Sequence, residues 1–281
     1  MKVNICNLGN KEWLDFKADI SFGLYFALKD LKCDVEMSVN ELKQGRLNIL
    51  LGADFLAGDE KAVQQFLNAK VDYVIYEVEN FDGKTINNRP NFNILNYKAL
   101  IERAAFIVTP YRKNIGPYQA ILASERVKYA RWGFYEQLRS ERIERGVCFE
   151  FDALYFGMLK GDRMQKLRYL TEVKKSKIKV LSRSDPLTLR DYYVSACRWG
   201  LNISYGNAEK FTNPFRLYYM AANGMPILSD LCADDDGYLE LCELSDFSVF
   251  ADLILVSEVE IKSPLERCRA NLLADNLRGV F

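Results

Sequence analysis

The clearest guide to the fold is residues 207–230, which read NAEKFTNPFRLYYMAANGMPILSD. Asn213 followed by Pro214 indicates a helix start, because asparagine caps helix N-termini well and proline fits the first helical position. Gly224 fits the end of that helix, and the apolar residues after it have the length of a short buried strand. This stretch therefore predicts a helix that leads directly into a strand.

The same alternation extends through the chain in both directions. Predicted strands cover residues 3–8, 35–39, 47–51, 71–77, 105–109, 127–131, 153–156, 178–182, 201–205, 226–229 and 253–257. Helical patterns lie between them, at residues 20–31, 60–69, 97–104, 118–126, 161–176 and from 264 onward. Strands that alternate with helices predict an α/β fold with parallel sheets.

Residues 136–150 are polar, charged and free of a strand pattern, so we expect a domain boundary there. The expected architecture is two Rossmann-like domains, over residues 1–140 and 141–281, whose parallel sheets face a central cleft. Open parallel sheets bind ligands at the carboxyl ends of their strands, so the cleft is the expected site.

The 281 residues include no histidine. The usual Ser-His-Asp and Cys-His nucleophile systems, HExxH zinc sites and His-ligated iron sites are therefore excluded. Seven scattered cysteines without a CxxC pair indicate reduced thiols, and no apolar run approaches the roughly 18 residues of a membrane span. We expect a soluble, cytoplasmic protein with no membrane contact, and no protein partner is inferred.

The net charge of zero conceals an uneven distribution. Residues 111–200 hold 19 basic and 10 acidic side chains, a net charge of +9, whereas residues 201–281 carry −7. Basic side chains mixed with aromatic ones are typical of nucleic-acid contacts. The candidates are Arg126, Lys128, Arg131, Arg139 and Arg142. The alternative is that the aromatic residues enter the core and that the later arginines, spaced three apart, lie on a solvated helix.

The predicted helix at Asn213 is also a candidate anion site. A helix N-terminus offers free backbone N–H groups and the positive end of a dipole, which suits a phosphate. Arg216, in the first turn, can add a bidentate contact. The alternative is a helix with good caps and no ligand.

Residues 216–227, RLYYMAANGMPI, resemble the nucleotide-sugar motif of GT-B glycosyltransferases, especially the CgeB-like branch. In that family a basic residue, a Glu three positions later and a Gly-x-Pro exit hold the diphosphate and ribose. Arg216 matches the basic residue and Gly224 with Pro226 match the exit, whereas Tyr219 stands where the family usually has Glu. The resemblance implies Asn213 and Arg216 around the phosphates and Tyr219 near the ribose or base.

Residues 154–170, LYFGMLKGDRMQKLRYL, resemble the first strand, turn and helix of the same nucleotide-binding domain. The resemblance implies that Gly157 lets the backbone approach the diphosphate and that Arg163 follows at the next helix start. Arg183, just past the predicted strand 178–182, is a further donor contact, or alternatively a solvated loop arginine.

By resemblance the chain is a hexosyltransferase with a UDP-sugar donor, UDP-glucose being the first expectation. No metal or other cofactor is required, because arginines and helix-terminal amides can stabilise the leaving diphosphate. The basic middle and compact size are similar to T-even-phage DNA glucosyltransferases, which implies glucosylated hydroxymethylcytosine in duplex DNA as acceptor, in a host cytoplasm. The alternatives are a transferase of surface-glycan synthesis and a non-catalytic nucleotide- or nucleic-acid-binding module.

An inverting enzyme of this fold needs a carboxylate base in its first domain. Asp19, the expected N-cap of the helix at 20–31, is the first candidate and Asp15 the second. Asp19 could alternatively serve only as that cap. Glu77 and Glu79, at the end of the strand predicted at 71–77, are further candidates. The acidic run 234–236 formally matches a metal-binding Asp-x-Asp pattern, but we expect a solvated loop.

Overall fold

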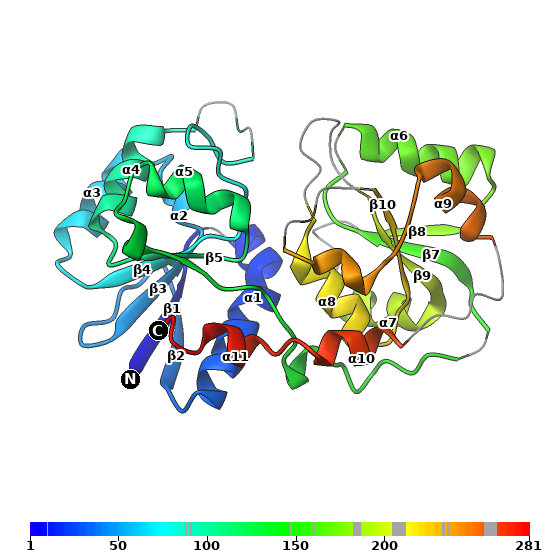
Figure 1. Cartoon of the computed structure of the whole chain (residues 1–281), viewed down its shortest axis with the longest axis horizontal. Helices are drawn as coiled ribbons and strands as arrows, with labels where there is room; N and C mark the ends of the chain where they lie inside the picture. The colour runs from blue at the N-terminus through cyan, green and yellow to red at the C-terminus, as the bar shows by residue number, and fades with distance from the viewer. Residues whose placement is uncertain are drawn as a thin grey trace. The chain divides into compact units, whose positions relative to one another are not determined.

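A computed structural model describes the chain except residues 10, 88, 90–91, 147, 160, 182–186, 204–211, 232–233, 235 and 256–262, and the side chains of 11–17 and 187. The chain forms two compact units (Figure 1). Unit 1 comprises residues 1–132 and 273–281, and unit 2 comprises residues 133–272.

Unit 1 contains a six-stranded sheet in the order β2-β1-β3-β4-β5-β6, and its paired strands run parallel. The strands are β1 (Lys2–Asn7), β2 (Asp34–Val39), β3 (Leu47–Leu51), β4 (Tyr73–Tyr76), β5 (Ile107–Thr109) and β6 (Val127–Tyr129). The helices are α1 (Lys11–Asp30), α2 (Ala53–Leu56), α3 (Glu60–Asn68), α4 (Ile94–Arg103), α5 (Ile115–Gln119) and α11 (Leu273–Leu277). Helices α1 and α11 lie on one face of the sheet and α2 to α5 on the other, so both faces are buried (Figure 1).

Unit 2 contains a five-stranded parallel sheet in the order β11-β10-β9-β7-β8. Its strands are β7 (Phe151–Phe156), β8 (Ile178–Leu181), β9 (Cys197–Asn202), β10 (Ile227–Asp230) and β11 (Glu243–Ser245). The helices are α6 (Asp162–Arg168), which continues as a π-helix over Tyr169–Val173, then α7 (Leu187–Ala196), α8 (Pro214–Ala222), α9 (Phe247–Leu253) and α10 (Pro264–Arg269). Helices α6 and α9 cover one face, and α7, α8 and α10 the other (Figure 1).

The predicted domain boundary at residue 140 needs a correction. The chain leaves unit 1 after Trp132, and its last nine residues, 273–281, return to that unit. Helix α11 packs on α1, the ring of Phe281 contacts that of Phe106 at 5.9 Å, and the Val280 carbonyl accepts a hydrogen bond from Nζ of Lys128. These contacts place residues 273–281 in unit 1, although they follow unit 2 along the chain. No local sequence pattern predicts them.

Two further predictions about elements are wrong. The strand expected at 253–257 does not begin where predicted, because Leu253 ends helix α9 and residues 254–255 form a turn, while 256–257 lie outside the described residues. In the described part of the chain the last strand of the sheet is β11. No helix carries the arginines between 139 and 146, which lie in turns and extended backbone. Their spacing of three residues therefore does not put them on one helical face.

Candidate functional site

The strand order of unit 2 creates a switch point between β7 and β9. From β7 the chain moves outward to β8, then crosses back to β9 on the other side of β7. The connections at the carboxyl ends of these two strands therefore leave in opposite directions, which opens a crevice where open parallel sheets bind ligands. The residues at this point are Phe156 with Gly157 and Asn202 with Ile203.

Arg216 extends from the first turn of α8 to both strand ends. Its Nη1 donates to the Phe156 carbonyl at 3.0 Å and its Nη2 to Oδ1 of Asn202 at 2.6 Å. The side chain is buried, and within the described part of the chain its Nε has no hydrogen-bond partner and no carboxylate pairs with it. A buried cation without a counter-ion favours an anionic ligand.

Asn213 fixes the start of α8 as predicted. Its side chain accepts a hydrogen bond from the Arg216 amide at 3.1 Å, and Pro214 occupies the first turn. The cap orients the helix N-terminus and with it the Arg216 side chain, because both lie in the same turn.

Gly157 allows this arrangement through its backbone and its lack of a side chain. Its φ is 143°, a region that other residues rarely adopt. A Cβ at this position would lie 3.0 Å from Nη1 of Arg216 and 3.3 Å from the hydroxyl oxygen of Tyr155. Any other residue would strain the backbone here and require the Arg216 guanidinium to shift.

Arg163 brings a second guanidinium to the same point. Its Nε donates to the Ile203 carbonyl at 2.8 Å, and Nη1 to the Met158 carbonyl at 3.4 Å. Burial lowers the pKa of Arg163, and the neighbouring Arg216 lowers it further. The carboxylate of Asp230 lies nearby but is bound to Nζ of Lys166 at 2.7 Å. We refer to Gly157, Arg163, Asn213 and Arg216 as the switch-point cluster.

Tyr219 lies buried beside this cluster. Its hydroxyl donates to Oδ1 of Asp191, its ring packs edge-on against Phe156 at 5.9 Å, and the Arg190 guanidinium lies 3.6 Å from its ring centroid. Burial raises the pKa of Tyr219 well above the ordinary value of 10. Where the related motif has a carboxylate, this chain therefore has a neutral phenol bonded to a carboxylate from α7.

The sequence prediction missed the contribution of α7. Pro186, followed by thirteen residues without glycine or proline, was an available signal for a helix start. The predicted donor contact Arg183 lies outside the described residues.

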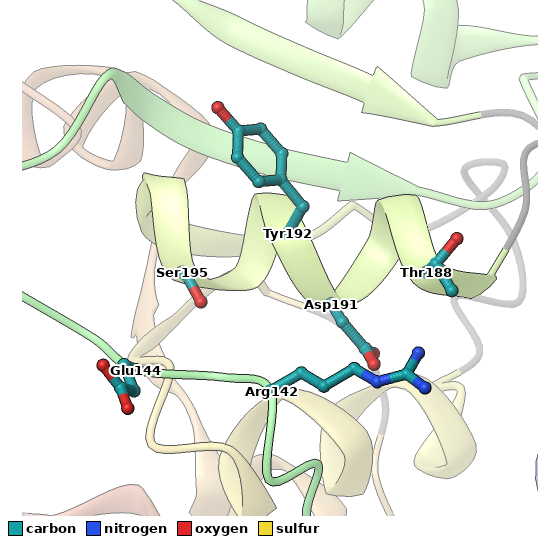
Figure 2. Close-up of a pocket in the computed structure, with 6 residues that line it drawn as sticks. All are labelled: Arg142, Glu144, Thr188, Asp191, Tyr192 and Ser195. Carbon is teal, nitrogen blue, oxygen red and sulfur yellow. The ribbon is translucent and has the colours of Figure 1, made fainter.

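A groove runs between α7 and residues 142–144 (Figure 2). Its volume is about 370 Å³, and it is lined by Arg142, Glu144, Thr188, Asp191, Tyr192 and Ser195. Asp191 and Ser195 point from α7 toward the 142–144 segment, while the ring of Tyr192 points away from it. Asp191 is thus shared between this groove and the Tyr219 hydroxyl.

In unit 1 the candidate bases lie on α1, which begins at Lys11 and not at residue 20. Asp19 is therefore inside the helix and is not its N-cap, which corrects the prediction. A helix that follows a parallel strand starts at the carboxyl edge of the sheet and runs back along it. Asp15 consequently lies about one turn closer to that edge than Asp19.

Glu77 follows β4 and is fully buried. Its Oε1 accepts from the Glu79 amide at 2.9 Å, and Tyr97, itself hydrogen-bonded to Tyr118 at 2.8 Å, contacts Oε2 at 2.5 Å. Burial, and then the nearby carboxylate of Asp54, raise the pKa of Glu77 to about 8. Such a group holds a proton at neutral pH inside the core, where it does not contact a substrate.

The five basic candidates are divided between the two units. Arg126, Lys128 and Arg131 belong to unit 1, and Arg139 and Arg142 to unit 2. Arg126 donates to the carbonyls of Glu102 and Ala104 at the end of α4, and Lys128 to that of Val280. Arg139 forms an ion pair with Glu136 at 3.0 Å.

Over the described ranges, no group of three or more Cys, Asp or Glu side chains is arranged to hold a metal ion. Asp234 instead accepts a hydrogen bond from the Leu239 amide. None of the helices described in the structure combines the length and apolar character needed to span a bilayer.

No protein-family model matches the sequence, and no curated protein matches it. Several solved structures match over nearly the whole chain. Alr3699/HepE from Anabaena, in complex with UDP and glucose, is 14% identical, with 99% of this chain and 95% of that chain covered and a TM-score of 0.54. AviGT4, a glycosyltransferase involved in avilamycin A biosynthesis, is 10% identical, with 100% and 96% covered and a TM-score of 0.56.

A UDP-N-acetylglucosamine 2-epimerase is 11% identical, with 99% of this chain and 93% of that chain covered and a TM-score of 0.51. Identities this low establish the fold alone. The predicted fold class, GT-B with two parallel-sheet α/β domains, is confirmed by this likeness and by the strand order of the two sheets.

Proposed function

We propose that this chain is a glycosyltransferase that uses a UDP-sugar and binds the diphosphate at the switch-point cluster of unit 2. The observation that carries the proposal is the convergence of Arg216 and Arg163 beside Gly157 at the ends of β7 and β9. Two guanidinium groups with one unpartnered buried Nε suit a ligand with two adjacent negative groups. The binding of UDP and glucose by HepE, which has a similar fold, supports a uridine nucleotide.

In this proposal the switch-point cluster stabilises the departing diphosphate. Negative charge grows on the diphosphate as the bond to the sugar breaks, and arginines already held by strand-end carbonyls need little reorganisation to meet it. The N-terminus of α8, which carries Arg216, adds the positive end of a helix dipole. We therefore propose that transfer needs no metal, so that excess EDTA leaves the rate unchanged.

Asp15 and Asp19 remain the proposed bases, and the start of α1 now favours Asp15. Asp15→Asn is expected to abolish transfer and to leave UDP binding unchanged, because the charge that is removed lies in unit 1. If Asp15→Asn retains normal turnover and Asp19→Asn loses it, the assignment returns to Asp19.

Hexose transfer to a hydroxyl on modified phage DNA is the acceptor hypothesis that follows from the resemblance. Arg126 and Lys128, two of the five basic candidates, donate to backbone carbonyls of unit 1, and we therefore propose a glycan acceptor as the second candidate. Incubation with labelled UDP-glucose, glucosylated hydroxymethylcytosine DNA and a panel of oligosaccharides decides between them. Salt-sensitive binding to duplex DNA supports the DNA acceptor.

The central test is calorimetric binding of UDP and UDP-glucose to the whole chain. We expect both to bind, and we expect Arg163→Ala to lose at least tenfold in affinity, about 1.4 kcal/mol. Arg168→Ala is the matched control, because it removes the same charge from an exposed position of the same helix. Absence of binding by any uridine nucleotide, or equal effects of the two variants, rejects the donor site. If UDP-glucose binds but no sugar is transferred to any acceptor tested, the result supports the alternative of a non-catalytic nucleotide-binding module.

A further inference from the structure

The groove between α7 and residues 142–144 shares no lining residue with the switch-point cluster, although Asp191 in its lining is hydrogen-bonded to Tyr219. Thr188, Asp191 and Ser195 are three and four residues apart, which places them along one side of α7 over about 10 Å. Arg142 and Glu144 form the opposite wall (Figure 2). The lining residues of α7 therefore extend over a distance longer than a single hexose ring.

The lining provides hydrogen-bonding groups of each kind. Among the described residues, neither Arg142 nor Glu144 forms an ion pair, although Arg139, three residues before Arg142, does. Two carboxylates and one guanidinium disfavour a phosphate. A carboxylate accepts, a guanidinium donates, and the hydroxyls of Thr188 and Ser195 do both. Adjacent hydroxyl groups on a neutral sugar need this combination.

Both walls are held in place by hydrogen bonds. Asp191 accepts from the Tyr219 hydroxyl through Oδ1 and from the Ser140 hydroxyl at 2.8 Å through Oδ2. Asn223, at the end of α8, accepts from the Ser140 amide at 2.8 Å and donates to the Leu138 carbonyl at 3.1 Å.

Arg145 fixes the far end of the same wall. It donates to the Arg198 carbonyl at 2.9 Å and to the Val194 carbonyl. The groove is thus largely preformed, which lowers the cost of ordering a ligand.

We propose that this groove binds a neutral oligosaccharide outside the donor site, as a segment of the acceptor glycan or of the lengthened product. The proposal deepens the proposed function by naming a glycan as the acceptor class. The assignment of the bound oligosaccharide as acceptor or product rests on the proposed function. Asp191 connects the groove to Tyr219 on α8, the helix that also carries Arg216.

The test measures binding of three neutral hexasaccharides, maltohexaose, cellohexaose and chitohexaose, by calorimetry. Thr188→Trp places a bulky ring in the groove, and Leu189→Trp adds the same ring at the next exposed position, outside the lining. We expect at least one hexasaccharide to bind, Thr188→Trp to weaken its binding at least tenfold, and Leu189→Trp to leave it unchanged. Arg142→Ala is expected to weaken binding by a smaller factor, since it removes donors without filling the groove.

UDP affinity is measured on the same variants and is expected to be unchanged, so that a failure of the donor site is distinguished from a failure of the groove. The proposal is overturned if none of the three hexasaccharides binds, or if Thr188→Trp binds as tightly as the unchanged chain. Tighter binding of a sulfated hexasaccharide than of all the neutral ones also overturns it, because it would assign the groove to anions.

Discussion

At the scale of the residue, Gly157 is the most constrained position of the candidate donor site. Gly157→Ala combines an unfavourable φ of 143° with a Cβ 3.0 Å from Nη1 of Arg216. We expect the guanidinium to be displaced from the Phe156 carbonyl and UDP affinity to fall at least tenfold, about 1.4 kcal/mol. Calorimetric titration with UDP measures this loss.

The control is Gly116→Ala in α5, where an added Cβ meets nothing within 4 Å and φ is not positive. That variant should bind UDP as the unchanged chain does and unfold at the same or a slightly higher temperature. Normal UDP binding by Gly157→Ala would show that UDP affinity does not depend on the position of the Arg216 guanidinium.

Glu77 predicts a pH dependence of the stability of unit 1. Its pKa is raised from an ordinary 4.5 to about 8 in the folded chain, so the folded state holds a proton that the unfolded state releases. Stability is therefore greatest below about pH 4.5 as far as this group is concerned, and it falls as pH rises to about 8. Thermal unfolding followed by circular dichroism from pH 5 to pH 9 should show a melting temperature lower by several degrees at the alkaline end.

Glu77→Gln tests the assignment because glutamine resembles the protonated acid. Its side-chain oxygen can accept from the Glu79 amide, and its NH₂ can donate to the Tyr97 hydroxyl. We expect this variant to lose most of the pH dependence between 5 and 9. An unchanged profile would attribute the dependence to another group.

At the scale of the element, the N-cap of α8 connects local sequence to the site. Asn213→Ala removes the acceptor for the Arg216 amide and is expected to cost about 1 kcal/mol of stability. It should also weaken UDP binding, because the turn that carries Arg216 loses its anchor. Asn213→Ser retains an acceptor and should recover most of both properties. Denaturant unfolding and UDP titration measure the two effects independently. If the variant loses stability but keeps full UDP affinity, Asn213 stabilises the fold and does not contribute to UDP binding.

Predictions from local sequence patterns were correct where neighbouring residues alone determine the helix, strand or cap. The cap at Asn213 is formed, and β3 covers the predicted residues 47–51. The same predictions were wrong where tertiary contacts determine where an element begins or ends. Helix α10 begins at Pro264 as predicted, but the single helix predicted from 264 onward is divided into α10 and α11. Helix α10 belongs to unit 2 and α11 to unit 1.

At the scale of the whole molecule, the C-terminal residues tie the end of the chain to unit 1. Removal of residues 273–281 deletes α11, with its buried Leu273 and Leu277, and the carbonyl that binds Lys128. We expect unit 1 to unfold at a lower temperature and unit 2 to be little affected, which calorimetry would record as separated transitions.

Leu277→Ala in the full chain tests the same contacts with a smaller change. Loss of a fully buried leucine is expected to cost about 2–5 kcal/mol, all of it in unit 1. A truncated chain that melts as a single transition at the original temperature would show that the C-terminal residues contribute nothing to unit 1.

The sequence by itself determined the alternation of strands and helices, the two parallel sheets and the residue types of the proposed phosphate site, because these depend on patterns within a few neighbouring residues. Only the tertiary structure decided which of those residues meet. Arg216 and Phe156 are 60 residues apart, yet the crossover from β8 to β9 brings them to 3.0 Å. The same packing divides the basic residues of the middle third between two units, and it joins Asp191 to Tyr219. Crossover connections of a parallel sheet bring distant segments together at strand ends, and no local pattern records which side chains then come into contact.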